Sequence, residues 1–156
     1  MVTLARRSLF LAAGLTLLAL SVSCNKGNQT VPSPTLMTED KTGTVPFLGS
    51  GDVRNADVKT FSVNYLYSQT PSTITVKSLQ SNATGANLAI TIGVAFGTPA
   101  FDGSCTRASV ATAAAAEVGK KYSTDYIFTA GNYCIAVYDA GTLTEATKYA
   151  ITIEHY

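Results

Sequence analysis

The sequence predicts an all-β domain, a two-sheet antiparallel β-sandwich, and three observations lead to this class. Apolar and polar residues alternate with a period of two in several short runs after residue 42. Turn-forming residues separate these runs. Roughly 115 residues belong to this region, which is enough for a core without metal. Each run places its large side chains on one face of a strand, and two sheets packed together bury such faces.

Residues 1–23 have the three-part organisation of an export signal. Arg6 and Arg7 supply a positive start, residues 9–20 are apolar, and small residues lead to Cys24. The apolar run is shorter than the roughly 20 residues that cross a bilayer, so we interpret the segment as a removed signal peptide. The residues before Cys24 resemble a lipoprotein signal, in which the cysteine receives a diacylglyceryl group. Ordinary secretion and an uncleaved anchor stay open as alternatives.

Lipidation at Cys24 implies a protein of the bacterial cell envelope, anchored to a membrane, whose domain faces the periplasm or the exterior. Residues 6–10, RRSLF, resemble the twin-arginine export signal, so this route and the general route both stay open. Residues 24–41 contain Pro, Ser, Thr, Gly and Asn with little apolar pattern, a composition that does not order a chain. We therefore expect a lipidated cysteine and flexible linker over residues 24–41 and the sandwich over residues 42–156.

Five alternating runs are the clearest strands of the sandwich. Large apolar residues occupy every second position of each run, and polar or small residues lie between them. About seven short strands are expected in all, each with one buried face. The five clear runs are residues 61–65, 73–77, 88–94, 133–138 and 149–154.

An alanine-rich segment, residues 107–121, interrupts this pattern. Alanine favours helix, and Gly119 suits the position just past a helix end. Alanine also packs in an irregular connection between sheets. We expect a short helical or irregular crossover here.

The remaining cysteines, Cys105 and Cys134, form an even pair once Cys24 is assigned to lipid. Because an exported protein enters an oxidising compartment, we expect one disulfide between the alanine-rich crossover and a strand near the C-terminus. Closing a loop of about 30 residues contributes on the order of 3 kcal/mol in the chain-entropy model. Two free thiols and a metal site are the alternatives, but a metal site needs three or four ligands and the sequence holds one histidine.

The C-terminal part of the chain carries a family resemblance. Residues 131–139, GNYCIAVYD, and residues 149–153, YAITI, resemble the last two strands of bacterial pre-peptidase C-terminal domains. Residues 61–63 and 73–76 are similar to an earlier strand pair of that family. The resemblance covers about residues 42–156. It implies a jelly-roll-like sandwich that serves secreted enzymes as a non-catalytic module for substrate binding, localisation or secretion.

The composition gives little support to nucleic-acid binding or catalysis. Charged residues make up 13% of the chain and the net charge is +1, so there is no basic footprint for nucleic acid. A hydrolase needs a nucleophile, a base and an orienting group, and His155 stands at the C-terminus, where we expect it to be exposed. The candidate carboxylates are scattered among expected loops and strand ends: Asp102, Asp125, Asp139 and Glu145. Solvated caps are the simplest role for them, and a hydrolytic carboxylate pair or a weak calcium site at Asp139 and Glu145 are the alternatives.

The chain has eight tyrosines and no tryptophan. Tyr65, Tyr133 and Tyr149 lie in apolar rows, where we expect them in the core. A partly exposed tyrosine suits carbohydrate or protein surfaces because its ring is apolar and its tip is polar. The candidate binding residues are Tyr67, Tyr122, Tyr126 and Tyr138.

The leading hypothesis is a membrane-anchored, non-catalytic module that binds a protein or glycan partner, with no catalytic residue, metal or cofactor. A structural or assembly accessory of the envelope or of secretion is the alternative. A carboxylate-based hydrolase is the third hypothesis.

Overall fold

The computed structural model describes residues 33–47, 56–64, 71–124 and 128–156. These residues form strands and no helix, so none of them belongs to a helix long and apolar enough to span a membrane. The strands are β1 (Met37–Val45), β2 (Asp57–Val63), β3 (Thr73–Ser81), β4 (Ile92–Pro99), β5 (Cys105–Ala116), β6 (Lys121–Ser123), β7 (Gly131–Tyr138) and β8 (Thr147–His155).

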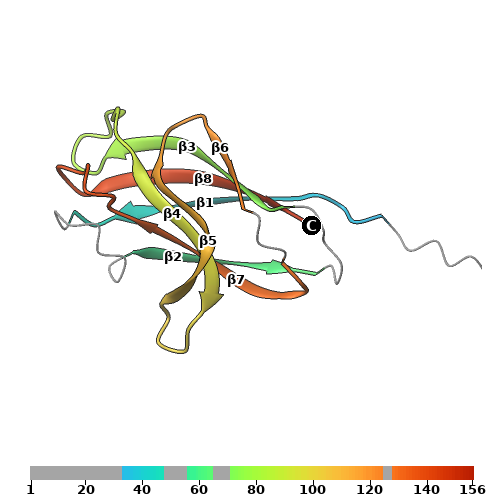
Figure 1. Cartoon of the computed structure of the whole chain (residues 1–156). Coiled ribbons are helices and arrows are strands. Elements are labelled where there is room, and N and C mark those ends of the chain that lie inside the picture. The colour runs from blue at the N-terminus through green and yellow to red at the C-terminus, as the bar shows by residue number, and fades with distance from the viewer. Residues whose placement is uncertain (1–32, 48–55, 65–70, 125–127) are drawn as a thin grey trace, which may run out of the picture. The chain divides into compact units, whose positions relative to one another are not determined.

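The strands form two four-stranded antiparallel sheets packed against each other, which confirms the predicted β-sandwich (Figure 1). One sheet has the order β1-β8-β3-β6, and the other has the order β2-β7-β4-β5. The chain therefore pairs β4 with β5, β3 with β6, β2 with β7 and β1 with β8. These four pairs correspond to one long antiparallel ribbon with the β4–β5 hairpin at its tip. The ribbon is rolled up into two sheets, which is the jelly-roll arrangement.

The core lies between the sheets and follows the alternation seen in the sequence. In β8, Tyr149, Ile151 and Ile153 are buried, and the residues between them are only half-buried. The expectation that Tyr133 and Tyr149 belong to the core is confirmed, since they are 7% and 3% exposed. Tyr65 lies outside the described residues.

A smaller cluster lies on the outer face of the β2-β7-β4-β5 sheet. The ring of Tyr138 packs across Gly93, where an added Cβ atom would lie 2.2 Å from the ring. Ala95 and Ala136 are buried beside it, and the guanidinium of Arg107 lies 5.7 Å from the ring centroid. The expectation that Tyr138 is partly exposed is therefore wrong, because small neighbours on the sheet let its ring pack down.

The alanine-rich segment is a strand, so the expected helical or irregular crossover is wrong. Residues 105–116 form β5, which pairs with β4 through two register shifts. The helix propensity of alanine is a weak prior that tertiary contacts override. Here Ala113 packs against the core and Ala116 is fully buried opposite Ile92, so the segment completes the second sheet. Gly119, with a φ of 82°, serves the turn from β5 to β6.

Two element boundaries also differ from the expectation. β1 begins at Met37, so residues 37–41, which we assigned to the linker, belong to the sandwich. The backbone of this strand pairs with β8 at nine positions. In the predicted run 88–94, only the part from Ile92 onward is strand, and Ile90 packs against the core from the preceding non-strand segment.

Cys105 and Cys134 form the predicted disulfide. It joins β5 to β7, although β4 lies between these strands in the sheet. Strands two places apart in a flat sheet lie roughly 10 Å apart, whereas the two Cα atoms are 5.9 Å apart. The start of β5 therefore folds over β4. Gly97 permits this, because an added Cβ atom would lie 2.1 Å from the carbonyl oxygen of Thr106.

Candidate functional site

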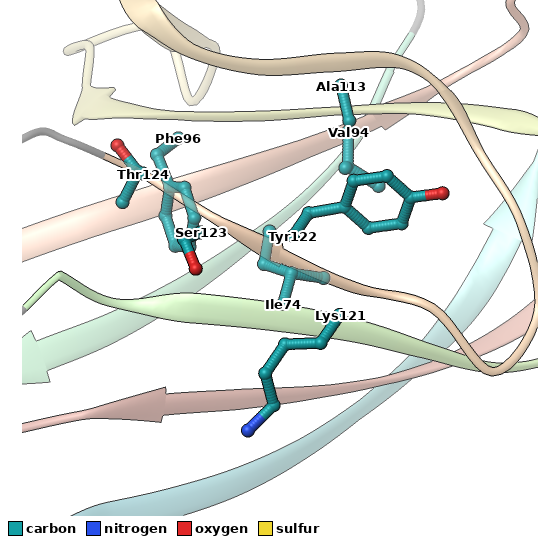
Figure 2. Close-up of a pocket in the computed structure, with 8 residues that line it drawn as sticks. All are labelled: Ile74, Val94, Phe96, Ala113, Lys121, Tyr122, Ser123 and Thr124. Carbon is teal, nitrogen blue, oxygen red and sulfur yellow. The ribbon is translucent and has the colours of Figure 1, made fainter.

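An apolar slot opens between the two sheets beside β5 and β6 (Figure 2). Its volume is about 220 Å³. Both sheets contribute to its walls, β3 and β6 from one and β4 and β5 from the other. The lining residues are Ile74, Val94, Phe96, Ala113, Lys121, Tyr122, Ser123 and Thr124.

The interior of the slot is made of core residues. Ile74, Val94 and Phe96 are buried members of the hydrophobic core. β6 has only three residues and pairs with only the first three residues of β3. The methyl group of Ala113 fills little of the space that a larger residue at this position in β5 would occupy. A short strand and a small side chain together leave the gap.

The rim of the slot is polar but carries no unpaired charge among the eight lining residues. The hydroxyl of Tyr122 accepts a hydrogen bond from the Glu117 main-chain N–H, 2.8 Å, which fixes the partly exposed ring at the mouth. The ammonium of Lys121 pairs with Glu154 and points away from the other lining side chains (Figure 2). Hydrogen bonds from Lys121 and then from Thr73 lower the pKa of Glu154, so this carboxylate stays ionised and holds the lysine.

The structure places the candidate binding tyrosines that it describes at two different locations. Tyr122 lies at the slot, and Tyr138 is buried on the outer face of the other sheet. Tyr67 and Tyr126 lie outside the described residues, so their role stays a prediction.

Sequence reasoning missed the walls of the slot. It assigned Ile74 and Val94 to the core and Ala113 to a crossover, and it gave none of them a binding role. Two features of the sequence pointed to a gap between the sheets: the apolar pattern around Tyr122 is short, and a run of small alanine residues lies next to it. These features can be interpreted as a gap only once β5 and β6 are known to face each other across the two sheets.

His155 is 2% exposed, so the expectation of an exposed residue at a frayed end is wrong. β8 extends through His155, and its alternate positions face the interior, which places this side chain inside. Its Nε2 lies 3.0 Å from Oε1 of Glu39 on β1, and its ring centroid lies 5.2 Å from that of Phe61. Its Nδ1 has no hydrogen-bond partner among the described residues. The pairing with Glu39 ties β8 to β1.

Glu39 makes this link sensitive to acid. Burial raises the pKa of Glu39, but hydrogen bonds and positive charges from Lys41 and His155 outweigh burial, so the pKa lies below its ordinary value of 4.5. As the pH falls, the unfolded chain therefore takes up more protons than the folded chain does. The stability that the ionised Glu39 contributes above pH 4.5 is lost as the pH drops through the folded-state pKa. Glu39→Gln is expected to cost less than about 1 kcal/mol at neutral pH, since the Glu39 side chain is 27% exposed and solvent screens its charge.

The same variant should lose stability less steeply than the native chain below pH 4.5, the ordinary value. Urea unfolding at neutral and at acidic pH measures both effects. Glu117→Gln, at an exposed residue paired with Lys120, is the matched control and should keep the native acid dependence. An unchanged acid dependence in Glu39→Gln would contradict the assignment.

Three of the four carboxylates considered for catalysis or calcium lie in the described part of the chain, where they serve turns and strand ends. Asp102 accepts hydrogen bonds from the hydroxyl and main-chain N–H of Ser104, which lower its pKa. Asp139 accepts two main-chain N–H groups of the following turn but is buried rather than solvated. Glu145 accepts a serine hydroxyl of β3, and Asp125 lies outside the described residues. No group of three or more His, Cys, Asp or Glu that could hold a metal ion occurs in the described part of the chain.

The described residues thus define an eight-stranded jelly-roll sandwich with one disulfide and an apolar slot between its sheets. No protein-family model matches the chain, and no curated protein matches it in sequence.

Proposed function

We propose that this chain is a lipid-anchored envelope protein whose sandwich is a non-catalytic module that binds a protein partner. The slot beside β5 and β6 is the observation that carries the proposal. An apolar side chain of the partner enters between Tyr122 and Ala113 and contacts Ile74 and Val94. The partner's main chain lies at the rim, near Ser123.

The slot suits an apolar side chain better than a sugar. Its volume of about 220 Å³ lies below the roughly 300–1,000 Å³ of small-molecule sites. Its inner walls are aliphatic and aromatic, so each buried sugar hydroxyl would lose its water at a cost of about 1–3 kcal/mol. Burying a leucine, isoleucine or phenylalanine side chain instead gains about 1.5–3 kcal/mol. Single anchors seated in a pocket commonly dominate protein interfaces.

The sequence before the sandwich supports the anchor. Arg6, Arg7, the apolar run 9–20 and Cys24 match the parts of a lipoprotein signal. Because β1 begins at Met37, residues 25–36 lie between the proposed acyl group and the first strand. Twelve residues of random coil have a root-mean-square reach of roughly 20 Å, so an acyl group on Cys24 would keep the module close to a bilayer. The resemblance to pre-peptidase C-terminal domains also favours a module that binds or localises.

A larger side chain at position 113 is expected to fill the slot and prevent partner binding. The test uses the full-length chain in a bacterial host, with a photo-crosslinking amino acid in place of Ser123 at the rim. Ala113→Leu should weaken the crosslinked protein adduct at least about tenfold, which corresponds to 1.4 kcal/mol. Ala114→Leu is the matched control, because Ala114 is exposed and lies outside the slot, and it should leave the adduct unchanged.

The same cells test the anchor. The chain should sit in the membrane fraction with an acyl group on Cys24. An unacylated chain in the soluble fraction would overturn the anchor, and an equally strong adduct in Ala113→Leu would overturn the slot. Thermal unfolding of both leucine variants shows that each is folded.

A further inference from the structure

A second hollow lies on the outer face of the β1-β8-β3-β6 sheet, away from the slot. Its volume is about 370 Å³. The methyl group of Ala150 forms its floor, and longer polar side chains stand around it. The lining residues are Thr42, Gly43, Thr44, Ser78, Gln80, Lys148, Tyr149 and Ala150.

Strand register brings these residues together in two rows. Ala150 on β8 lies between Thr42 on β1 and Ser78 on β3. Lys148 lies in the next row outward on β8, between Thr44 and Gln80. Side chains directly opposite each other on neighbouring strands have Cβ atoms about 4.5–5.5 Å apart, close enough to contact one ligand together.

Four polar side chains around this hollow have no partner in the described part of the chain, unlike those further along the same face. The other polar groups of the lining are engaged: Gln80 donates to Asn87, and the Tyr149 hydroxyl and the Thr44 main-chain N–H donate to Asp57. Further along the face, Asp40 accepts the hydroxyl of Thr152, and Glu154 accepts Thr73 and Lys121. By contrast, the Lys148 ammonium and the hydroxyls of Thr42, Thr44 and Ser78 make no hydrogen bond or ion pair within the described part of the chain. One uncompensated positive charge therefore stands beside three hydroxyls that can both donate and accept.

We propose that this hollow binds an acidic saccharide, a sugar that bears a carboxylate. The carboxylate pairs with the Lys148 ammonium in a charge-assisted hydrogen bond, and the sugar hydroxyls exchange hydrogen bonds with Thr42, Thr44 and Ser78. No side chain with a large apolar surface faces the hollow except Tyr149, whose ring points into the core, so the hollow offers nothing to an apolar anchor. Its volume falls within the range of small-molecule sites. The site is independent of the slot and of the partner proposed for it.

The test titrates the full chain, purified in detergent, with three probes: a galacturonic acid trisaccharide, maltotriose and inorganic phosphate. Amide chemical shifts should move at Thr42, Ser78 and Lys148 with the galacturonate probe. Lys148→Gln should weaken that binding at least about tenfold, and Lys148→Arg, which keeps the charge, should retain most of it. Lys120→Gln is the matched control, since it removes the same charge from a lysine in the β5–β6 turn.

Three results would overturn the proposal. If the galacturonate probe moved no amide chemical shifts at the hollow, the proposed binding site would be wrong. Maltotriose bound as tightly as galacturonate would remove the role of the carboxylate. Phosphate bound as tightly as galacturonate would reduce the site to simple anion binding. Ala113→Leu should leave galacturonate binding intact, so failure here and failure of the slot are distinguishable.

Discussion

Replacing Phe61 by alanine is expected to lower the free energy of unfolding by about 3–5 kcal/mol. Phe61 is 3% exposed, and its ring centroid lies 5.9 Å from Phe96, 5.7 Å from Phe128 and 5.9 Å from Tyr133. The truncation removes apolar burial and leaves a cavity lined by these rings. Because β4 and β7 hold Phe96 and Tyr133 in place, we expect the cavity to collapse only partially. A loss of this size is a large part of the roughly 5–15 kcal/mol that stabilises a typical domain.

Urea unfolding followed by far-ultraviolet circular dichroism measures this loss. Thr60→Ala is the matched control, because Thr60 is the exposed neighbour on the same strand and faces outward. Its unfolding free energy should stay within about 0.5 kcal/mol of the native value. Equal losses in the two variants would show that the aromatic cluster does not carry the core.

The sequence predicts a strand where one face is a clear apolar row. β7 and β8 have such rows, so their positions were found. β1 has none, because its inward positions include Glu39, Lys41 and Gly43 before Val45. Inward charges on an edge strand discourage pairing with another chain, and they also remove the periodic signal. β1 was therefore assigned to the linker.

β5 was missed for a different physical reason. Its alanines have a real helix propensity, worth less than about 1 kcal/mol per residue against ordinary alternatives. Pairing with β4 and burial of Ala116 in the core outweigh that preference, but these contacts lie outside the alanine segment itself. Local propensity cannot report them.

Both candidate sites depend on strand register, which a single sequence does not contain. Thr42, Ala150 and Ser78 become neighbours only because β8 lies between β1 and β3. The slot depends on β6 ending at Ser123, so that β3 is only partly covered. Tyr122 was found by its chemistry, a ring with a polar tip outside the main apolar rows, and chemistry is the part of a site that sequence retains.

Removing the disulfide is expected to lower the free energy of unfolding by about 3–4 kcal/mol. The cysteines are 29 positions apart, and the chain-entropy model assigns about this value to a loop of that length. The double variant Cys105→Ala with Cys134→Ala avoids placing a hydroxyl at Cys134, which is fully buried. Urea unfolding of the oxidised native chain and of the double variant measures the difference.

The location of the bond adds a second expectation. Because the disulfide holds the start of β5 over Gly97, its loss should release the β4–β5 hairpin and increase amide exchange at Thr106 and Arg107 more than in β8. A reducing agent should reproduce both effects in the native chain and change nothing in the double variant. A double variant as stable as the oxidised native chain would contradict both expectations. Packing alone would then hold β5 in place, and the cross-link would not restrict the conformations of the unfolded chain.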